Sequence, residues 1–408
     1  MAANKRYQWT LVLLLSFNFG VVFFDRNAFN FLVPFIAPEL GLNNTQIGLI
    51  GAGLSFSWAL AGLFIGRLSD LIGRRKAILV VCTLAFSAAS VLSGFALGFV
   101  TLLATRLLMG IAEGGIMPIS QTLIAAEVDP ARRGLAQGLA QNFGANIIAN
   151  SLGPIVIVAV AAALGWRQAF MLAALPGFLM AVLIAWLVRE PPAVEQSARA
   201  APGDFRRLLG QPEILRCVAI SILLVAYLVV FSLFTPQFLV QARGIAPERI
   251  GWIMSTFGFA SIAIAFLVPG SSDRFGRRLV SLVAAALGIV LPAGLLLTQG
   301  PAETPLMAVI AVGAAFSGMF PLVMATIPSE LVGPGRAATA MSLTMGISEI
   351  LGGVLAPSLA GVAADAYGLV AIVWIMLVLA VLVFLLAFTL PETAPRVLAA
   401  RAAASGKP

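Results

Sequence analysis

The sequence contains no histidine, only two cysteines and few charged residues. Asp, Glu, Lys and Arg make up 10% of its 408 residues, whereas a soluble domain carries about 25%. Without histidine the chain can form neither a Cys/His metal site nor a His-based catalytic triad. Cys82 and Cys217 each stand alone in separate apolar segments. We therefore expect no enzyme activity, no metal site and no cofactor.

Hydrophobic residues are abundant and make up 60% of the chain. They form runs long enough for spanning helices, each of which needs roughly 20 mostly apolar residues. The runs are continuous and do not alternate, which favours helices over a β-barrel. We expect an all-α membrane protein with twelve transmembrane helices, near residues 9–36, 46–68, 76–97, 99–125, 135–162, 167–188, 213–240, 248–269, 278–297, 304–328, 337–361 and 368–390.

The net charge of +8 could indicate nucleic-acid binding, but the distribution of the charges argues against it. With both termini in the cytoplasm, most of the 25 Lys and Arg residues fall in cytoplasmic segments. The exceptions are Arg26, Arg106, Arg167, Arg243 and Arg249. This is the positive-inside asymmetry. It predicts a multi-pass protein of a bacterial inner membrane with both termini cytoplasmic, and with the lipid bilayer and no nucleic acid as its partner. We expect the protein to be monomeric.

The chain also contains a duplication. Adding 203 to a position often finds the same residue, as for Gly48 and Gly251, Glu127 and Glu330, and Pro154 and Pro357. The clearest block is SDLIGRR (69–75) against SDRFGRR (272–278). We expect two pseudo-symmetric six-helix bundles, 1–190 and 213–391, joined by a polar cytoplasmic linker (191–212) and followed by a tail (392–408). The sequon Asn43-Asn44-Thr45 is expected to cap the second helix rather than carry a glycan.

The segment GRLSDLIGRRKA (66–77) resembles the loop 2–3 signature of the major facilitator superfamily, and the second half has the weaker copy expected there. The resemblance covers the whole chain. It implies two halves that rock about a central cavity and so give alternating access. No soluble domain or catalytic constellation supports a sensor or a membrane enzyme instead.

A narrower resemblance, to the anion:cation symporters, rests on Asp25-Arg26, Pro34, PELGL (38–42) and Arg106-x-x-x-Gly110-x-x-Glu113. It implies import of a small organic anion by proton symport. Trp58 stands where that family usually has Tyr, and the seventh helix is more apolar than usual. These departures favour a smaller or more apolar carboxylate over a polyhydroxy one.

Charged residues within the apolar segments are the leading site candidates, because a charge inside a membrane is costly and usually functional. Arg26, and with it Arg106, suits a carboxylate ligand, since a guanidinium binds two oxygens and keeps its charge. Asp25, Glu113 and Glu349 are the candidate proton carriers. At 1.5 Å per residue Asp25 and Arg106 lie at similar depth, which permits a direct pair. The alternative is that these charges form structural ion pairs between helices.

Further candidates follow from helix position. Asn142, Asn146 and Asn150 recur on one helical stripe, beside Gln141, and could contact substrate or join helices through hydrogen bonds. Trp58, Tyr227 and Gln237 are substrate candidates by helix assignment only, with packing as the alternative. By resemblance, a set of cytoplasmic charges forms a conformational latch between the halves, with topology alone as the alternative: Asp70, Arg74, Arg75, Arg133, Asp273, Arg277, Arg278 and Arg336.

A proton-driven efflux carrier for drugs or other amphiphiles is the alternative function. Such carriers often have G-x-x-x-G-P-x-x-G-G in the fifth helix. Here only Gly153-Pro154 fits, with Ile157 and Val158 where the last glycines belong.

Overall fold

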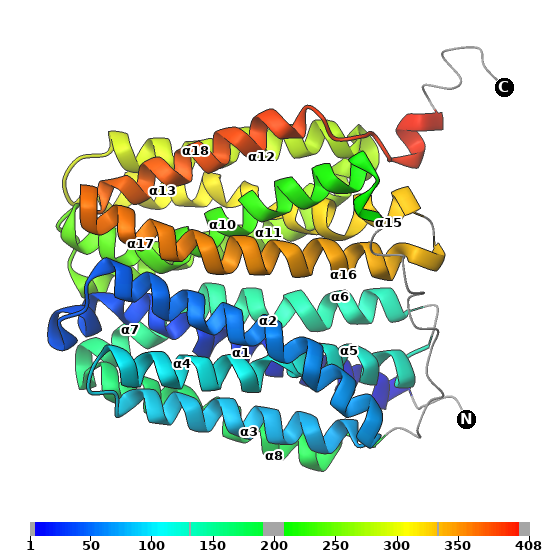
Figure 1. Cartoon of the computed structure of the whole chain (residues 1–408), viewed down its shortest axis with the longest axis horizontal. Helices are drawn as coiled ribbons and strands as arrows, with labels where there is room; N and C mark the ends of the chain where they lie inside the picture. Colours follow the sequence, from blue (N-terminus) through cyan, green and yellow to red (C-terminus); the bar gives the residue numbers. More distant parts are fainter. Residues whose placement is uncertain (1–4, 130–131, 191–207, 333, 400–408) are drawn as a thin grey trace.

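The computed structural model describes residues 5–129, 132–190, 208–332 and 334–399. Its helices form two layers, one above the other in Figure 1. The N-terminal half contains α1 (Lys5–Leu40), α2 (Asn44–Ile72), α3 (Arg75–Gly94), α4 (Phe99–Gly114), α5 (Ile116–Glu127), α6 (Arg133–Gly144), the π-helix η1 (Ala145–Leu152), α7 (Gly153–Leu164) and α8 (Trp166–Leu187).

The C-terminal half repeats this plan. It contains α10 (Pro212–Gln241), η2 (Pro247–Arg249), α11 (Ile250–Phe275), α12 (Arg277–Leu297), α13 (Glu303–Gly313), η3 (Ala314–Gly318), α14 (Met319–Pro321), η4 (Leu322–Thr326), α15 (Ile327–Val332), α16 (Pro334–Ile350), η5 (Leu351–Leu355), α17 (Ala356–Tyr367) and α18 (Val370–Ala387).

Eleven helical stretches among the described residues are long and apolar enough to cross a membrane. The 29-residue α2 brings the number to the twelve that the apolar runs predict. The start of α1 and the end of α18 lie at the same end of the molecule, which we call the terminal end (right in Figure 1). The predicted linker falls largely on residues 191–207, outside the described residues.

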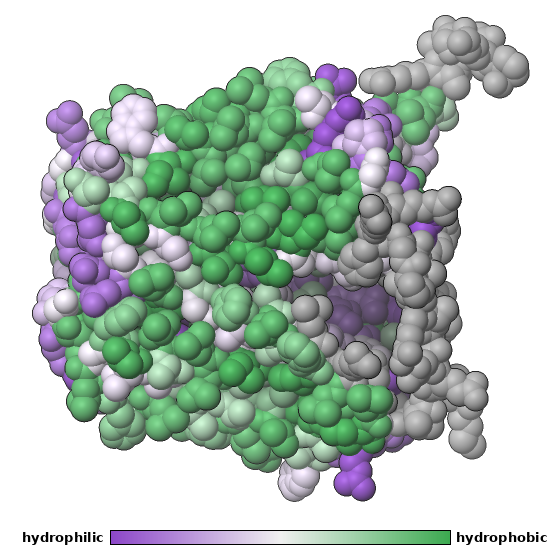
Figure 2. Space-filling model, in the orientation of Figure 1, coloured by the Kyte–Doolittle hydropathy of each residue, from purple (hydrophilic) through white to green (hydrophobic). Residues whose placement is uncertain are grey.

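Large apolar side chains cover much of the outside of both halves, as expected for a surface that faces lipid (green in Figure 2). Along α8, for example, Leu172, Leu175, Leu179, Val182 and Trp186 are exposed at three- and four-residue spacing. That spacing places them on one side of the helix. The buried side of α8 carries smaller residues such as Ala173 and Gly177.

The duplication reappears as matched contacts between the halves, away from the terminal end. A Cβ added to Gly48 in α2 would lie 2.2 Å from the carbonyl oxygen of Pro357 in α17. A Cβ added to Gly251 in α11 would lie 2.5 Å from the carbonyl oxygen of Pro154 in α7. Both glycines and both prolines are pairs at the 203-residue offset. The same close crossing has therefore been kept in both copies.

A carboxylate also joins the halves at this opposite end. Asn43 caps α2, as predicted, because its side chain accepts from the Gln46 backbone N–H at 2.8 Å. Asp365 of α17 then accepts four hydrogen bonds from the first residues of α2, two from Asn44 and two from Thr45, at 2.6–2.9 Å. Toward the terminal end, by contrast, Figure 2 shows a hydrophilic hollow between the halves.

Candidate functional site

Arg26 of α1 lies where the two halves meet. Its Nη2 donates to Ser55 Oγ of α2 and to Glu349 Oε1 of α16, each at 3.1 Å. The guanidinium carbon lies 5.3 Å from the ring centre of Trp58. The side chains of Arg26 and Glu349 are 13% and 19% exposed, so neither is sealed from water. We call Arg26, Ser55, Trp58 and Glu349 the interface cluster.

A second cluster is enclosed within the N-terminal half. Asp25 is fully buried and accepts a 2.5 Å hydrogen bond from Ser90 of α3. Arg106 of α4 donates to Ser93 of α3 at 2.8 Å. Among the described residues Asp25 and Arg106 form no direct ion pair, so the pair that their similar depth permits is not made. Two serines one turn apart on α3 stand between them instead.

Arg106 is only 1% exposed. Its Nη1 lies 3.2 Å from Met109 Sδ, and its guanidinium carbon lies 4.8 Å from the ring centre of Phe170. Arg106 was predicted to bind substrate, but this packing encloses it within one half. Arg26 and Arg106, which the sequence presents alike, thus occupy different environments.

Glu113 of α4 is also 1% exposed, and neither of its carboxyl oxygens has a hydrogen-bond partner within the described residues. The charges that act on it are those of Arg26, Asp25 and Arg106. Gly110 and Gly114 draw α4 against α2: an added Cβ would lie 2.0 Å from Ser57 Oγ and 2.6 Å from the Trp58 carbonyl oxygen, respectively. Keeping an unpartnered buried carboxyl group ionised is costly, so Glu113 is suited to hold a proton.

The asparagines of the fifth span connect to α1 through a residue that the sequence analysis missed. Asn27 donates to Asn150 at 3.4 Å, and Asn150 donates to Asn146 at 3.3 Å within η1. Asn142 is exposed and donates to the Gly138 carbonyl oxygen, and Gln141 is half-buried next to it. The sequence could have indicated Asn27 as a site candidate, because it directly follows Arg26.

Tyr227 and Gln237 lie in the interior of α10 and are not joined to the interface cluster. Tyr227 is fully buried, donates to the Gly288 carbonyl oxygen at 3.1 Å and packs on Phe316 with ring centres 4.4 Å apart. Gln237 is 3% exposed. Packing, the alternative left open for both, agrees with these positions.

The charged residues near the loop between α11 and α12 form a network within the C-terminal half. Arg277 pairs with Asp273 at 2.5 Å and with Glu330 at 2.9 Å. Glu392 accepts from the Arg277 backbone N–H at 2.8 Å, and Glu190 accepts from the Lys76 backbone N–H in the first copy. Arg74 and Arg278 are exposed, Arg75, Arg133 and Arg336 are half-buried, and the side chain of Asp70 lies outside the described part.

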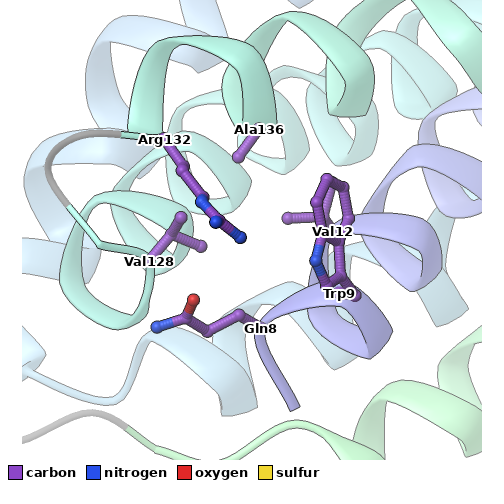
Figure 3. Close-up of a pocket in the computed structure, with 6 residues that line it drawn as sticks. All are labelled: Gln8, Trp9, Val12, Val128, Arg132 and Ala136. Atoms are coloured by element: carbon purple, nitrogen blue, oxygen red, sulfur yellow. The ribbon is translucent and has the colours of Figure 1, made fainter. Parts of the chain in front are cut away.

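A small pocket lies at the terminal end, apart from both clusters. Gln8, Trp9 and Val12 of α1 line one side of it, and Val128, Arg132 and Ala136 line the other. The Arg132 side chain points into the space between Val128 and Trp9 (Figure 3). None of the predicted substrate or proton residues lines it.

The family of the chain follows from its similarity to known proteins. The model of the Major Facilitator Superfamily matches residues 15–245 and 230–407. The chain belongs to this superfamily. The fold agrees: a crystal structure of a bacterial homologue of the human lysosomal transporter Spinster covers 94% of the chain, with 98% of its own length, a TM-score of 0.77 and 20% identity.

Curated relatives in the superfamily differ in what they carry. The protein named "Probable sulfoacetate transporter" of Cupriavidus necator is 27% identical over 67% of the chain and 67% of its own length. The hexuronate transporter of Bacillus subtilis is 32% identical over 61% of the chain and 62% of its own length. The multidrug resistance protein MdtL of Salmonella heidelberg is 27% identical over 79% of the chain and 80% of its own length. The chain is thus a superfamily transporter, similar to both anion and drug carriers.

Proposed function

We propose that this protein is a secondary active transporter that imports a small organic carboxylate by proton symport through alternating access. The interface cluster carries the proposal. Arg26 offers a permanently charged, planar, partly exposed guanidinium at the boundary of the two halves, where a superfamily member must bind what it carries. The organic anions named for two relatives agree with a carboxylate ligand.

The other candidate residues, and Asn27 with them, have different roles in this proposal. Trp58 supplies an aromatic face next to Arg26, and Asn27, Gln141, Asn142, Asn146 and Asn150 supply neutral hydrogen-bonding groups for the rest of the substrate. Asp25, Glu113 and Glu349 carry protons. Arg106 balances the charge of Asp25 through the serines of α3 and does not touch substrate.

The terminal end is assigned to the cytoplasm of a bacterial inner membrane, in agreement with the distribution of Lys and Arg. The hollow between the halves then faces the cytoplasm. In the outward-open state the charged residues near the terminal end, Asp273 and Arg277 among them, would meet the other half and act as the latch. The protein is proposed to work as a monomer.

Substitution of Arg26 tests the carboxylate anchor. Arg26→Lys keeps the charge but loses the two-pronged donor, so affinity for carboxylates should fall. Arg26→Ala removes a hydrogen bond to a charged group, worth about 1.5–3 kcal/mol, and should weaken binding roughly 10- to 100-fold. The measurement is titration calorimetry of the purified protein with glucuronate and sulfoacetate.

Arg249→Gln is the control for Arg26. Arg249 forms an exposed ion pair with Glu303 at the opposite end, so its loss should leave carboxylate affinity unchanged. If both Arg26 variants bind carboxylates as tightly as the wild type, Arg26 has a structural role and the anchor lies elsewhere.

Proton-driven efflux remains the second candidate because of the similarity to MdtL. Ile157 and Val158 argue against it: they stand where efflux carriers often have two glycines, and both are buried. Transport in oriented proteoliposomes separates the two functions. Carboxylate import should follow an outside-acid pH gradient, whereas proton-driven export of ethidium with no carboxylate uptake would establish the efflux function.

A further inference from the structure

We propose that Glu349 takes the place of the substrate carboxylate on Arg26 when the site is empty, and that substrate exchanges with it as one proton binds Glu349. This inference rests on the proposed function, and it gives Glu349 a role distinct from that of Glu113. It makes Glu349 an internal competitor of the substrate.

The geometry of the pair supports an exchange. Glu349 Oε1 and Ser55 Oγ both accept from Nη2 of Arg26, each at 3.1 Å. Glu349 thus accepts a single hydrogen bond from Arg26. A free carboxylate can accept two parallel N–H bonds from a guanidinium. A substrate can therefore replace Glu349 with a better-matched pair of hydrogen bonds. The partial exposure of both side chains gives it a route of approach.

Close packing of the halves fixes the position of Glu349. A Cβ added to Gly353 would lie 3.3 Å from Glu349 Oε1 and 3.5 Å from Ser55 Cβ. Glycine at this position thus leaves room for Glu349 and for the approach of η5 to α2. Because the Arg26–Glu349 bond joins the two halves, its exchange for a substrate contact also changes what holds the halves together.

Charge balance explains why the exchange needs a proton. In the empty site the charges of Arg26 and Glu349 cancel. An incoming carboxylate adds one negative charge, and an uncompensated charge in a partly buried site is unfavourable because it loses solvation without gaining a partner. A proton that binds a carboxylate oxygen of Glu349 restores neutrality, and no other covalent bond changes. Each substrate carboxylate therefore brings one proton.

Arg26 is the charged partner of Glu349 among the described residues, because the polar groups on the neighbouring helices bond elsewhere. On α10, Arg216 donates instead to the Thr389 carbonyl oxygen at 3.3 Å, and Tyr227 donates to the Gly288 carbonyl oxygen.

The acids on the other helices near Glu349 are bonded to other groups. Asp365 of α17 is bonded to the first residues of α2, and Glu330 of α15 is paired with Arg277. Asp25, which precedes Arg26 in α1, and Glu113 of α4 are both buried in the N-terminal half with carboxyl oxygens that have no partner among the described residues, so these two acids could also take up protons. The test must therefore separate the proton bound by Glu349 from protons bound by these acids.

Proton uptake on binding is the direct measurement. Wild-type protein in weakly buffered detergent solution is titrated with glucuronate or sulfoacetate, and a pH-indicator dye reports the protons bound. The titration is run at a pH where Glu349 of the empty wild-type protein is ionised. There the Glu349→Gln variant should take up about one proton fewer than the wild type for each substrate bound. It should also bind at least as tightly as the wild type, with a flatter pH dependence. The Glu113→Gln variant should still take up the proton that binds Glu349 when substrate binds.

Two further variants guard against misfolding and non-specific effects. Glu303→Gln, which breaks the ion pair with Arg249 at the opposite end, should match the wild type. Glu349→Asp keeps an acid, so the infrared band of a protonated carboxyl group that appears on substrate binding should shift in Glu349→Asp and be absent from Glu349→Gln. The band remaining unchanged in either variant would overturn the proposal.

The outcomes also separate this inference from the proposed function. If wild-type protein binds no carboxylate, the proposed function fails. If the wild type binds carboxylates while Glu349→Gln binds them more weakly or takes up as many protons as the wild type, only the exchange on Arg26 is wrong.

Discussion

Neighbouring residues on α1 face two different environments. Arg26 reaches the interface cluster and is partly exposed, whereas Asp25 turns into the N-terminal half and is fully buried. Solvent reaches the first side chain and not the second. In the function we propose, this division separates the binding of substrate at Arg26 from the storage of protons at Asp25 and Glu113.

The sequence predicts the charged residues of the site much better than their partners. Arg26, Asp25 and Glu113 stand out because charges are rare in apolar segments. Which groups pair is not evident: Glu349, itself a candidate, is 323 residues from Arg26, and serine is ordinary in membrane helices. Which serine meets which charge depends on helix packing, and a single sequence does not give that packing.

Glu113→Gln should weaken the coupling of transport to the proton gradient. The amide mimics the protonated acid, so the variant should bind substrate and perform counterflow exchange, which needs no net proton movement. Accumulation driven by a pH gradient should fall, because the variant keeps only the proton that binds at Glu349. Both assays are run in the same proteoliposomes. If the variant concentrates substrate as well as the wild type does, Glu113 is not a coupling acid and Glu349 alone remains next to the substrate.

At the scale of helices, the apolar runs predict the spans to within a few residues but not their irregularities. The fifth and eleventh spans each contain a π-helix, η1 and η5, at positions related by the 203-residue offset. A π-helical turn keeps the same apolar composition as an α-helical one and often marks a functional site. The duplicated Gly and Pro residues predict a repeat, yet only the structure reveals that they touch across the halves.

Gly110→Ala should destabilise the protein, because the new Cβ would lie 2.0 Å from Ser57 Oγ and 2.5 Å from the Leu54 carbonyl oxygen. Overpacking of this kind costs about 1–3 kcal/mol. Gly138→Ala in α6 is the matched control, since no atom lies within 4 Å of its added Cβ. It should be neutral or stabilising by about 0.5–1 kcal/mol. Thermal unfolding in detergent compares the two, and equal midpoints would contradict the close α2–α4 contact.

At the scale of the whole molecule, the two-bundle architecture follows from the sequence but the state of opening does not. Both states of an alternating-access carrier use the same helices and the same apolar surface. The difference lies in contacts such as that between Asp365 and the start of α2. Asp365 sits near the end of α17 with no distinguishing motif around it, so its partner could not be predicted.

Asp365→Asn should shift the population toward the state that is open at the opposite end. The carboxylate accepts four hydrogen bonds at the N-terminus of α2, where a negative charge is also favoured by the helix dipole. A neutral amide offers one accepting oxygen and no charge. A loss of about 1–2 kcal/mol would change the ratio of the two states by roughly 5- to 30-fold.

Spin labels at Leu97 and Leu297 can measure this shift, because both positions are highly exposed at the opposite end, one in each half. The labels are placed in a background that lacks Cys82 and Cys217. In Asp365→Asn the longer label-to-label distances should gain population. Glu39→Gln is the control, since Glu39 binds Arg167 and Trp166 within one half and its loss should leave the distances unchanged. If Asp365→Asn also leaves them unchanged, the Gly48–Pro357 and Gly251–Pro154 crossings keep this end closed without help from the carboxylate.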